Sequence, residues 1–160
     1  IVLVKDSDVS KLKELHKLGP EPLEISSAEF CRLFGHKRGY LKPVLMDPFF
    51  IVGIGNIYSD EILWQAGLHP LSRVEKLSRR QLNLLFKSIH SVLKKAIKYK
   101  GSSNDDYRIP SGQKGEFQNM QKAYQKTGKK CAKHDGGTIS RIKLAGRSAH
   151  FCPKHQKIIK

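Results

Sequence analysis

The sequence predicts a mainly α-helical chain that ends in a small β-hairpin ribbon. Two observations predict the helices: two stretches begin with a helix-capping serine, and the longer of them repeats apolar residues with a period near 3.6. A third observation predicts the ribbon. Near the C-terminus, a cysteine and a histidine separated by two residues occur twice, a spacing that directs four ligands at one metal ion. At 160 residues the chain is long enough for one modest core or two small ones.

The chain opens on an element without a partner nearby in the sequence. Residues 1–4 are an apolar, largely β-branched run, which predicts an edge strand left over from another domain. We therefore expect residues 1–22 to be this remnant strand and an interdomain linker. Because the first residue is Ile1 and not a methionine, we also expect the chain to be a piece of a longer protein.

The first two helices are predicted to be short. Ser26 and Glu29 have the spacing of a capping box, and the apolar residues after them predict a helix that ends near Gly35. A second short helix is expected from about Pro43, a residue well suited to a first helical turn, to just before Pro48.

Two glycines and an asparagine stand directly before the third predicted helix, in the stretch IVGIGNIYSDEILWQAGLHP. Gly53 and Gly55 permit backbone conformations that other residues disfavour. The helix that follows, from Asn56 to its stop at Gly67, begins with unpaired N–H groups of partial positive charge. Such a corner suits an anion. The alternative is an ordinary tight turn that leads into a helix.

The longest predicted helix is capped by Ser78. Its apolar stripe consists of Leu82, Leu85, Phe86, Ile89, Val92, Leu93, Ala96 and Ile97. The lysines at positions 87, 94, 95 and 98 lie largely off this stripe and form either a solvated face or a contact for a polyanion. From Gly101 onward, a stretch rich in Gly, Ser and Asp predicts a long loop, and loops of that length are often functional.

The charge of the chain implies a polyanionic partner. The formal net charge is +16, and residues 121–160 hold eleven Lys and Arg against the single acid Asp135. Nucleic acid and an anionic membrane surface both fit this charge. The sequence contains no apolar run near the roughly 18 residues of a spanning helix and does not start like a signal peptide. We therefore favour nucleic acid and an intracellular protein.

The paired cysteines and histidines predict a zinc ribbon. The expected ligands are Cys131, His134, Cys152 and His155, with seventeen residues between the two pairs and a turn at Ala145 and Gly146. His150 is an alternative to His155, although the paired spacing favours the latter. The competing interpretation is that the cysteines are merely buried and the histidines solvated. Cys31 has no such partner and is expected to be a small buried residue.

Five motifs then carry a resemblance to a known family. They are LGPEPL at 18–23, LKPVLMDP at 41–48, GIGNIYSDEILWQAGLHP at 53–70, GSSNDDY at 101–107, and GEFQ followed by the Cys/His segment that ends in GRSAHFCPKHQ. Over nearly its whole length the chain resembles the C-terminal half of a formamidopyrimidine-DNA glycosylase. Pro48 stands where that family usually has glutamine, and His134 and His155 stand where it has cysteines.

The resemblance implies a fold and a set of DNA contacts. A helix–two-turn–helix domain with a base-recognition loop is expected over 23–120 and a β-hairpin zinc finger over 121–160. Asn56 is expected to contact phosphate through its amide, and Lys42 and Arg147 to hold the strand. The full expected DNA-binding set is Lys42, Gly53, Gly55, Asn56, Tyr58 and Arg147. The expected base-recognition loop, which closes over an extruded base, is Ser102, Ser103, Asn104, Asp105, Asp106 and Tyr107.

The resemblance also implies an activity, namely base-excision repair by a bifunctional glycosylase and abasic-site lyase that acts on 8-oxoguanine and formamidopyrimidines. Enzymes of this family attack the sugar with the amine of an N-terminal proline, which is followed by a glutamate. This chain begins at Ile1, so we expect it to lack the catalytic domain and to bind DNA without catalysis. The expected partners are damaged double-stranded DNA and the missing N-terminal domain. One structural zinc ion, a monomeric state, a nucleoid location and no membrane contact complete the expectation.

Two other functions are compatible with the residues. The first is a stand-alone, non-catalytic module that recognises damaged DNA and carries a zinc ribbon. The second is a basic zinc ribbon that binds RNA, but the ribbon segment lacks an aromatic platform on which bases would stack.

Overall fold

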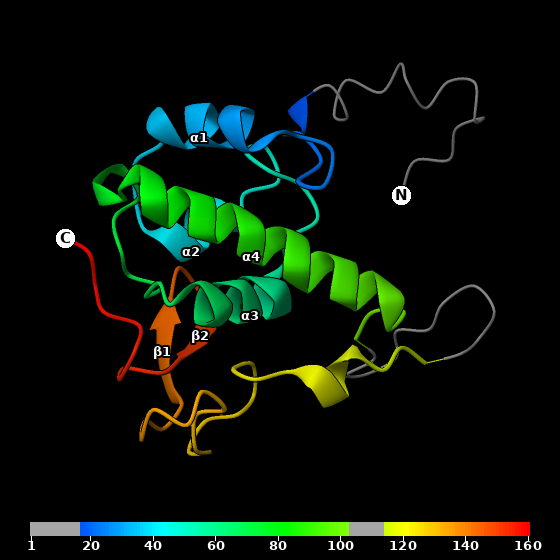
Figure 1. The fold of residues 1–160 in the computed structure, drawn as a ribbon, viewed down its shortest axis with the longest axis vertical. Helices are drawn as coiled ribbons and strands as arrows, with labels where there is room; N and C mark the ends of the chain where they lie inside the picture. The colour runs from blue at the N-terminus through cyan, green and yellow to red at the C-terminus, as the bar shows by residue number, and fades with distance from the viewer. Residues whose placement is uncertain (1–16, 103–113) are drawn as a thin grey trace.

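The computed structural model describes residues 17–102 and 114–160, and helices dominate this part (Figure 1). In chain order the elements are α1 (Ser27–Gly35), α2 (Leu41–Leu45), α3 (Asn56–Ala66), the 3-10 helix η3 (Val74–Lys76), α4 (Arg79–Lys98), the 3-10 helix η4 (Phe117–Met120), β1 (Ser140–Leu144) and β2 (Arg147–Phe151). The predicted mainly α chain with a C-terminal hairpin is thus confirmed. The strand expected at residues 1–4 lies outside the described residues.

The helix ends follow the capping signals in the sequence. The Ser26 side chain accepts the Glu29 N–H while the Glu29 carboxylate accepts the Ser26 N–H, which makes the predicted capping box of α1. Ser78 and Gln81 form the same arrangement at the start of α4. Helix α3 ends at Gly67, whose φ of 70° is a left-handed conformation that favours glycine.

Helix α2 differs slightly from the prediction, because it begins at Leu41 and not near Pro43. Pro43 is its third residue. The first N–H groups of a helix have no partner within it, so a proline there removes no helical hydrogen bond.

The main core lies where α1 and α3 pack against α4, the long helix that crosses the molecule in Figure 1. Fully buried side chains from these helices include Phe30, Ile62, Leu85 and Ile89. The apolar stripe predicted for α4 is confirmed up to Ala96. Ile97 is the exception, since its side chain is 67% exposed near the end of the helix.

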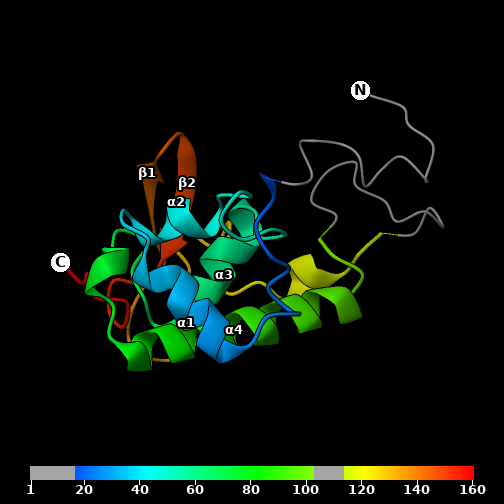
Figure 2. The same cartoon turned by 90° about the horizontal axis from the view of Figure 1, so that it is seen from above.

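The two strands form an antiparallel hairpin in which Leu144 pairs with Arg147 across the predicted turn. Ala145 and Gly146 both have positive φ, 48° and 76°, as a two-residue hairpin turn requires. In Figure 2 the hairpin and α2 lie side by side, on the face opposite α4. No helix within residues 17–102 and 114–160 combines the length and apolar character needed to cross a bilayer.

The ribbon that contains the hairpin has little core of its own. Its buried apolar cluster consists of Cys131, Ile139 and Cys152, and Trp64 of α3 packs against it. Its order therefore depends on contacts with α3 and on whatever holds the two cysteines together.

Glu61 of α3 attaches the segment that leads into the ribbon. Its carboxylate accepts backbone N–H groups from Lys122, Ala123 and Tyr124 at 2.8–2.9 Å. Burial raises the pKa of the Glu61 carboxyl, and the three N–H donors oppose that rise. One helix side chain thus fixes three consecutive residues of a distant segment.

The substitution Glu61→Gln is expected to lower the free energy of unfolding at neutral pH by about 2 kcal/mol, because an amide offers one acceptor oxygen to three buried donors. Urea denaturation monitored by circular dichroism measures the change. Glu24→Gln makes the same chemical change on an exposed carboxylate and serves as the control. Equal stability of the two variants would show that the three contacts do not hold the segment.

Candidate nucleic-acid interface and metal centre

Of the two glycines in the turn before α3, one adopts a backbone conformation that favours glycine. Gly53 has a φ of 78°, in the left-handed region, whereas Gly55 is extended and stands before Asn56 without a side-chain cap on the helix. The first N–H groups of this 11-residue helix therefore lack the side-chain acceptor that a serine or aspartate would supply. The Asn56 side-chain oxygen Oδ1 is buried and has no hydrogen-bond partner among the residues that the structure describes.

Lys42, expected to hold a phosphate, is a buried residue with only 1% exposure. Its ammonium group donates to the Asp60 carboxylate and, at 3.4 Å, to the backbone oxygen of Asn56. Burial lowers the pKa of Lys42, and the charge of Asp60 opposes this. The resemblance led us to expect that Lys42 holds the DNA strand, and the structure shows this lysine in a buried ion pair beside the start of α3.

Asp60 is a central residue of this region that sequence reasoning missed. Besides Lys42, its carboxylate accepts the His150 backbone N–H at 3.0 Å and lies 2.8 Å from His150 Nδ1. His150, the alternative metal ligand, is therefore engaged with α3 and lies outside the metal-ligating group described below. One indication in the sequence that Asp60 belongs to this region is that it follows Asn56 by one helical turn and therefore lies on the same face of α3.

A hollow of about 250 Å³ separates α2 from the tip of the hairpin. Its lining residues are Lys42, Pro43, Met46, Leu144, Ala145 and Arg147. Two of the predicted DNA contacts, far apart in sequence, thus line one hollow. Arg147 is exposed at the first position of β2.

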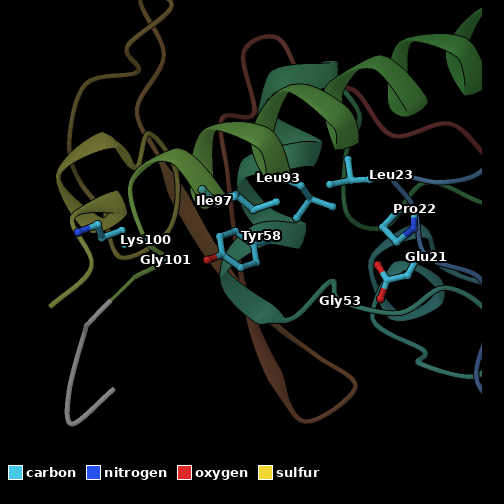
Figure 3. Close-up of a pocket in the computed structure, with 10 residues that line it drawn as sticks. Glu21, Pro22, Leu23, Gly53, Tyr58, Leu93, Ile97, Lys100 and Gly101 are labelled. Carbon is cyan, nitrogen blue, oxygen red and sulfur yellow. The ribbon is translucent and has the colours of Figure 1, made fainter. Parts of the chain in front are cut away.

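A second, more apolar pocket of about 420 Å³ lies beside Gly53 and the C-terminal part of α4 (Figure 3). Its lining residues are Glu21, Pro22, Leu23, Gly53, Tyr58, Leu93, Ala96, Ile97, Lys100 and Gly101. Tyr58, another predicted contact, presents its ring to this pocket and packs edge-on against Phe117, with ring centroids 5.4 Å apart. Ile97, which is exposed near the end of α4, is one of the residues that line the pocket.

The predicted base-recognition loop begins at the rim of this pocket. Gly101 lines the pocket, and the next residue, Ser102, pairs with Glu116 and accepts a hydrogen bond from Gln121 at 3.1 Å. Ser103, Asn104, Asp105, Asp106 and Tyr107 lie outside the described residues.

Three of the four expected metal ligands meet in the ribbon. The ligand atoms of Cys131, Cys152 and His155 lie within 4.8 Å of one another, and Asp135 completes this group in the described part of the chain. His134 is exposed and is not a member of it, although it lines with Cys131 a hollow of about 400 Å³. The paired spacing predicted His134 as the fourth ligand, whereas the structure brings Asp135 next to the other three residues.

Asp135 is tied to its neighbours by several hydrogen bonds. Desolvation alone would raise its pKa, but the Gly137 N–H, the His155 ring and the Cys152 thiol together hold the pKa of Asp135 at about 2. Gly137 has to be a glycine here, since a Cβ atom would collide with the Cys152 sulfur. Two thiols with an imidazole form a donor set that suits zinc.

Comparison with known proteins assigns the fold to a family. Residues 18–107 match the family model described as "Formamidopyrimidine-DNA glycosylase H2TH domain". A formamidopyrimidine-DNA glycosylase of Desulfitobacterium hafniense is 39% identical over 153 residues, which cover 94% of this chain and 56% of that protein. One from Heliobacterium modesticaldum is 43% identical over 143 residues, covering 88% and 51%.

Solved structures of DNA complexes resemble the chain as well. The complex of Lactococcus lactis Fpg with DNA containing an abasic site has a TM-score of 0.86 and 36% identity, over 96% of this chain and 57% of that one. MutM bound to DNA with carbocyclic 8-oxo-G has a TM-score of 0.83 and 37% identity, over 96% and 56%. The chain spans about half the length of the relatives it matches. It belongs to the formamidopyrimidine-DNA glycosylase family, of which it contains the H2TH domain.

Proposed function

We propose that this chain is the DNA-binding part of a base-excision repair enzyme, a bifunctional glycosylase and abasic-site lyase for oxidised purines such as 8-oxoguanine and formamidopyrimidines. Since the chain spans about half of its relatives, the nucleophile of the reaction is assigned to the remaining half of the protein. Two units divide the work: residues 23–120 hold the damaged strand, and residues 121–160 form a zinc finger. The protein acts as a monomer on duplex DNA.

The observation that carries this proposal is the hollow between α2 and the hairpin. Arg147 lines this hollow together with Lys42, which contacts the backbone of Asn56 at the uncapped start of α3. A guanidinium binds phosphate oxygens with paired donors, and helix N-terminal N–H groups add a favourable partial charge. In this proposal Lys42 acts from its buried ion pair by fixing Asn56, while Arg147 reaches the phosphate directly.

The apolar pocket in Figure 3 is the proposed receptor for an extruded base. Its volume, about 420 Å³, falls within the usual range for small-ligand sites. Leu93 and Ile97 supply apolar walls for the faces of a base, and the Glu21 carboxylate at one end offers an acceptor for N–H groups on its edge. The predicted loop from Ser102 to Tyr107 is proposed to close this pocket.

We further propose that Cys131, Cys152 and His155 hold a zinc ion with His134 as the fourth ligand. Structural zinc sites are almost always completed by cysteine or histidine, and His134 shares a hollow with Cys131. Asp135 then has a supporting role, in which its carboxylate accepts the Gly137 backbone N–H and holds the loop between the two ligand pairs. When bound, the ion supplies no chemistry to the reaction and orders the ribbon that carries Arg147.

Borohydride trapping tests the division between binding and chemistry. The full chain is mixed with duplex DNA carrying an abasic site or 8-oxoguanine, beside a gel-shift assay and a full-length family member as the positive control. We expect a shift without a covalent adduct, because borohydride traps only an imine between the sugar and an attacking amine. A trapped adduct would show that an amine of this chain attacks the sugar.

Arg147→Ala should weaken binding to abasic-site DNA about tenfold or more. It should also reduce by about one the slope of log affinity against log salt concentration, because one fewer phosphate is neutralised. Fluorescence anisotropy at several salt concentrations measures both quantities. Arg80→Ala removes the same side chain from an exposed position of α4, a helix on the face opposite the hairpin in Figure 2, and should change affinity far less. Equal losses in the two variants would mean that only net charge matters.

The fourth zinc ligand can be assigned by a pair of variants. We expect His134→Ala to reduce zinc affinity far more than Asp135→Ala, because loss of a ligand removes a bond to the metal, whereas loss of the Asp135 carboxylate removes a hydrogen bond to the Gly137 backbone. Competition with a chromogenic chelator measures the affinities. The reverse order would assign the fourth position to Asp135.

A further inference from the structure

Trp64, in the last turn of α3, packs directly against the candidate metal centre. Its indole nitrogen donates a hydrogen bond to the Cys131 sulfur at 3.3 Å. Its ring meets the His155 imidazole edge-on, with centroids 5.9 Å apart and planes at 83°. A helix residue thus touches two of the proposed ligands, one of them through a polar contact.

The backbone of Trp64 makes a second polar contact with the same centre. His155 Nε2 lies 3.2 Å from the Trp64 carbonyl oxygen, while His155 Nδ1 lies 3.8 Å from the Cys131 sulfur. One ring nitrogen therefore faces the donor group and the other faces α3. Metal-binding histidines characteristically donate their second N–H to a carbonyl or carboxylate, which fixes the tautomer and the orientation of the ring.

We propose that Trp64 is a positioning residue of the zinc centre, which orients Cys131 through its indole N–H and His155 through its carbonyl oxygen. The proposal rests on the zinc site proposed above. An N–H donor at a thiolate withdraws electron density from the sulfur and limits its motion, so it tunes the metal–sulfur bond as well as the geometry. The centre is thereby anchored to the helix whose first residue is Asn56.

A purely packing role for Trp64 is the competing explanation, and Lys133 provides the control for it. The Lys133 ammonium lies over the indole ring, 5.1 Å from its centroid, and donates to the Gln65 backbone oxygen at 3.2 Å. Lys133→Gln therefore loosens the same junction without removing the N–H···S contact. Trp64→Phe removes that contact and keeps an aromatic ring in place.

The test compares Zn²⁺ affinity by chelator competition and the thiolate-to-metal charge-transfer band of the Co²⁺-loaded chain. Trp64→Phe is expected to reduce Zn²⁺ affinity about tenfold or more and to shift the cobalt band to lower energy, since a sulfur without its N–H donor is a stronger electron donor. Lys133→Gln should leave the band in place. In the Zn²⁺-loaded wild-type chain, the indole N–H resonance of Trp64 should exchange slowly with solvent.

Unchanged affinity and an unchanged band in Trp64→Phe would overturn the proposal, as would fast exchange of the indole proton in the loaded wild-type chain. The exchange measurement needs no variant, so the proposal stays testable if Trp64→Phe fails to fold. A wild-type chain that binds no Zn²⁺ would instead refute the zinc site on which the proposal rests.

Discussion

A single buried carboxylate, that of Asp60, holds together the elements that carry the proposed phosphate contacts. From the middle of α3 it binds the Lys42 ammonium of α2 and both the backbone and the ring of His150 in β2. An isolated charge at such depth would be strongly unfavourable, and it is tolerated here because every partner is polar and within hydrogen-bond distance. Asp60 therefore links α2 directly to β2, the strand that begins with Arg147.

Helix α3 is the element through which the rest of the molecule is connected. Its start forms the uncapped corner at Asn56, its middle binds α2, β2 and the segment after η4, and its last turn touches the cysteine-rich ribbon. The ribbon lacks a core large enough to fold alone, so its order comes from this helix and from its ligand cluster. A basic surface contributes affinity for a polyanion in many arrangements, but a defined register on DNA requires such rigid connections.

The helices were predictable from the sequence because caps and apolar periods depend on near neighbours, and both capping serines are confirmed. The polar network around Asp60 could not be predicted from the sequence. Asp60 and His150 are 90 residues apart, and neither belongs to a sequence pattern that indicates a contact between them. Lys42 was expected to hold the DNA strand, and its buried ion pair with Asp60 was not predicted. The apolar period of α4 also predicted, wrongly, that Ile97 is buried. Such a period shows which face of a helix is apolar, but it does not show where the helix extends beyond the protein core. The paired cysteine and histidine spacing located three members of the metal-ligating cluster, and a role for His134 as the fourth ligand remains a prediction.

The mixed cysteine and histidine ligand set proposed for the ribbon has a consequence for its resistance to oxidation. Thiolates pass through sulfenic, sulfinic and sulfonic acids when oxidants are abundant, whereas imidazole does not follow that route. If two of the four proposed ligands are histidines, the ribbon has two oxidisable ligands, Cys131 and Cys152, and both are buried. A protein proposed to act on oxidised bases works where oxidants have been present, and this ribbon exposes less sulfur to the agents that create its substrate.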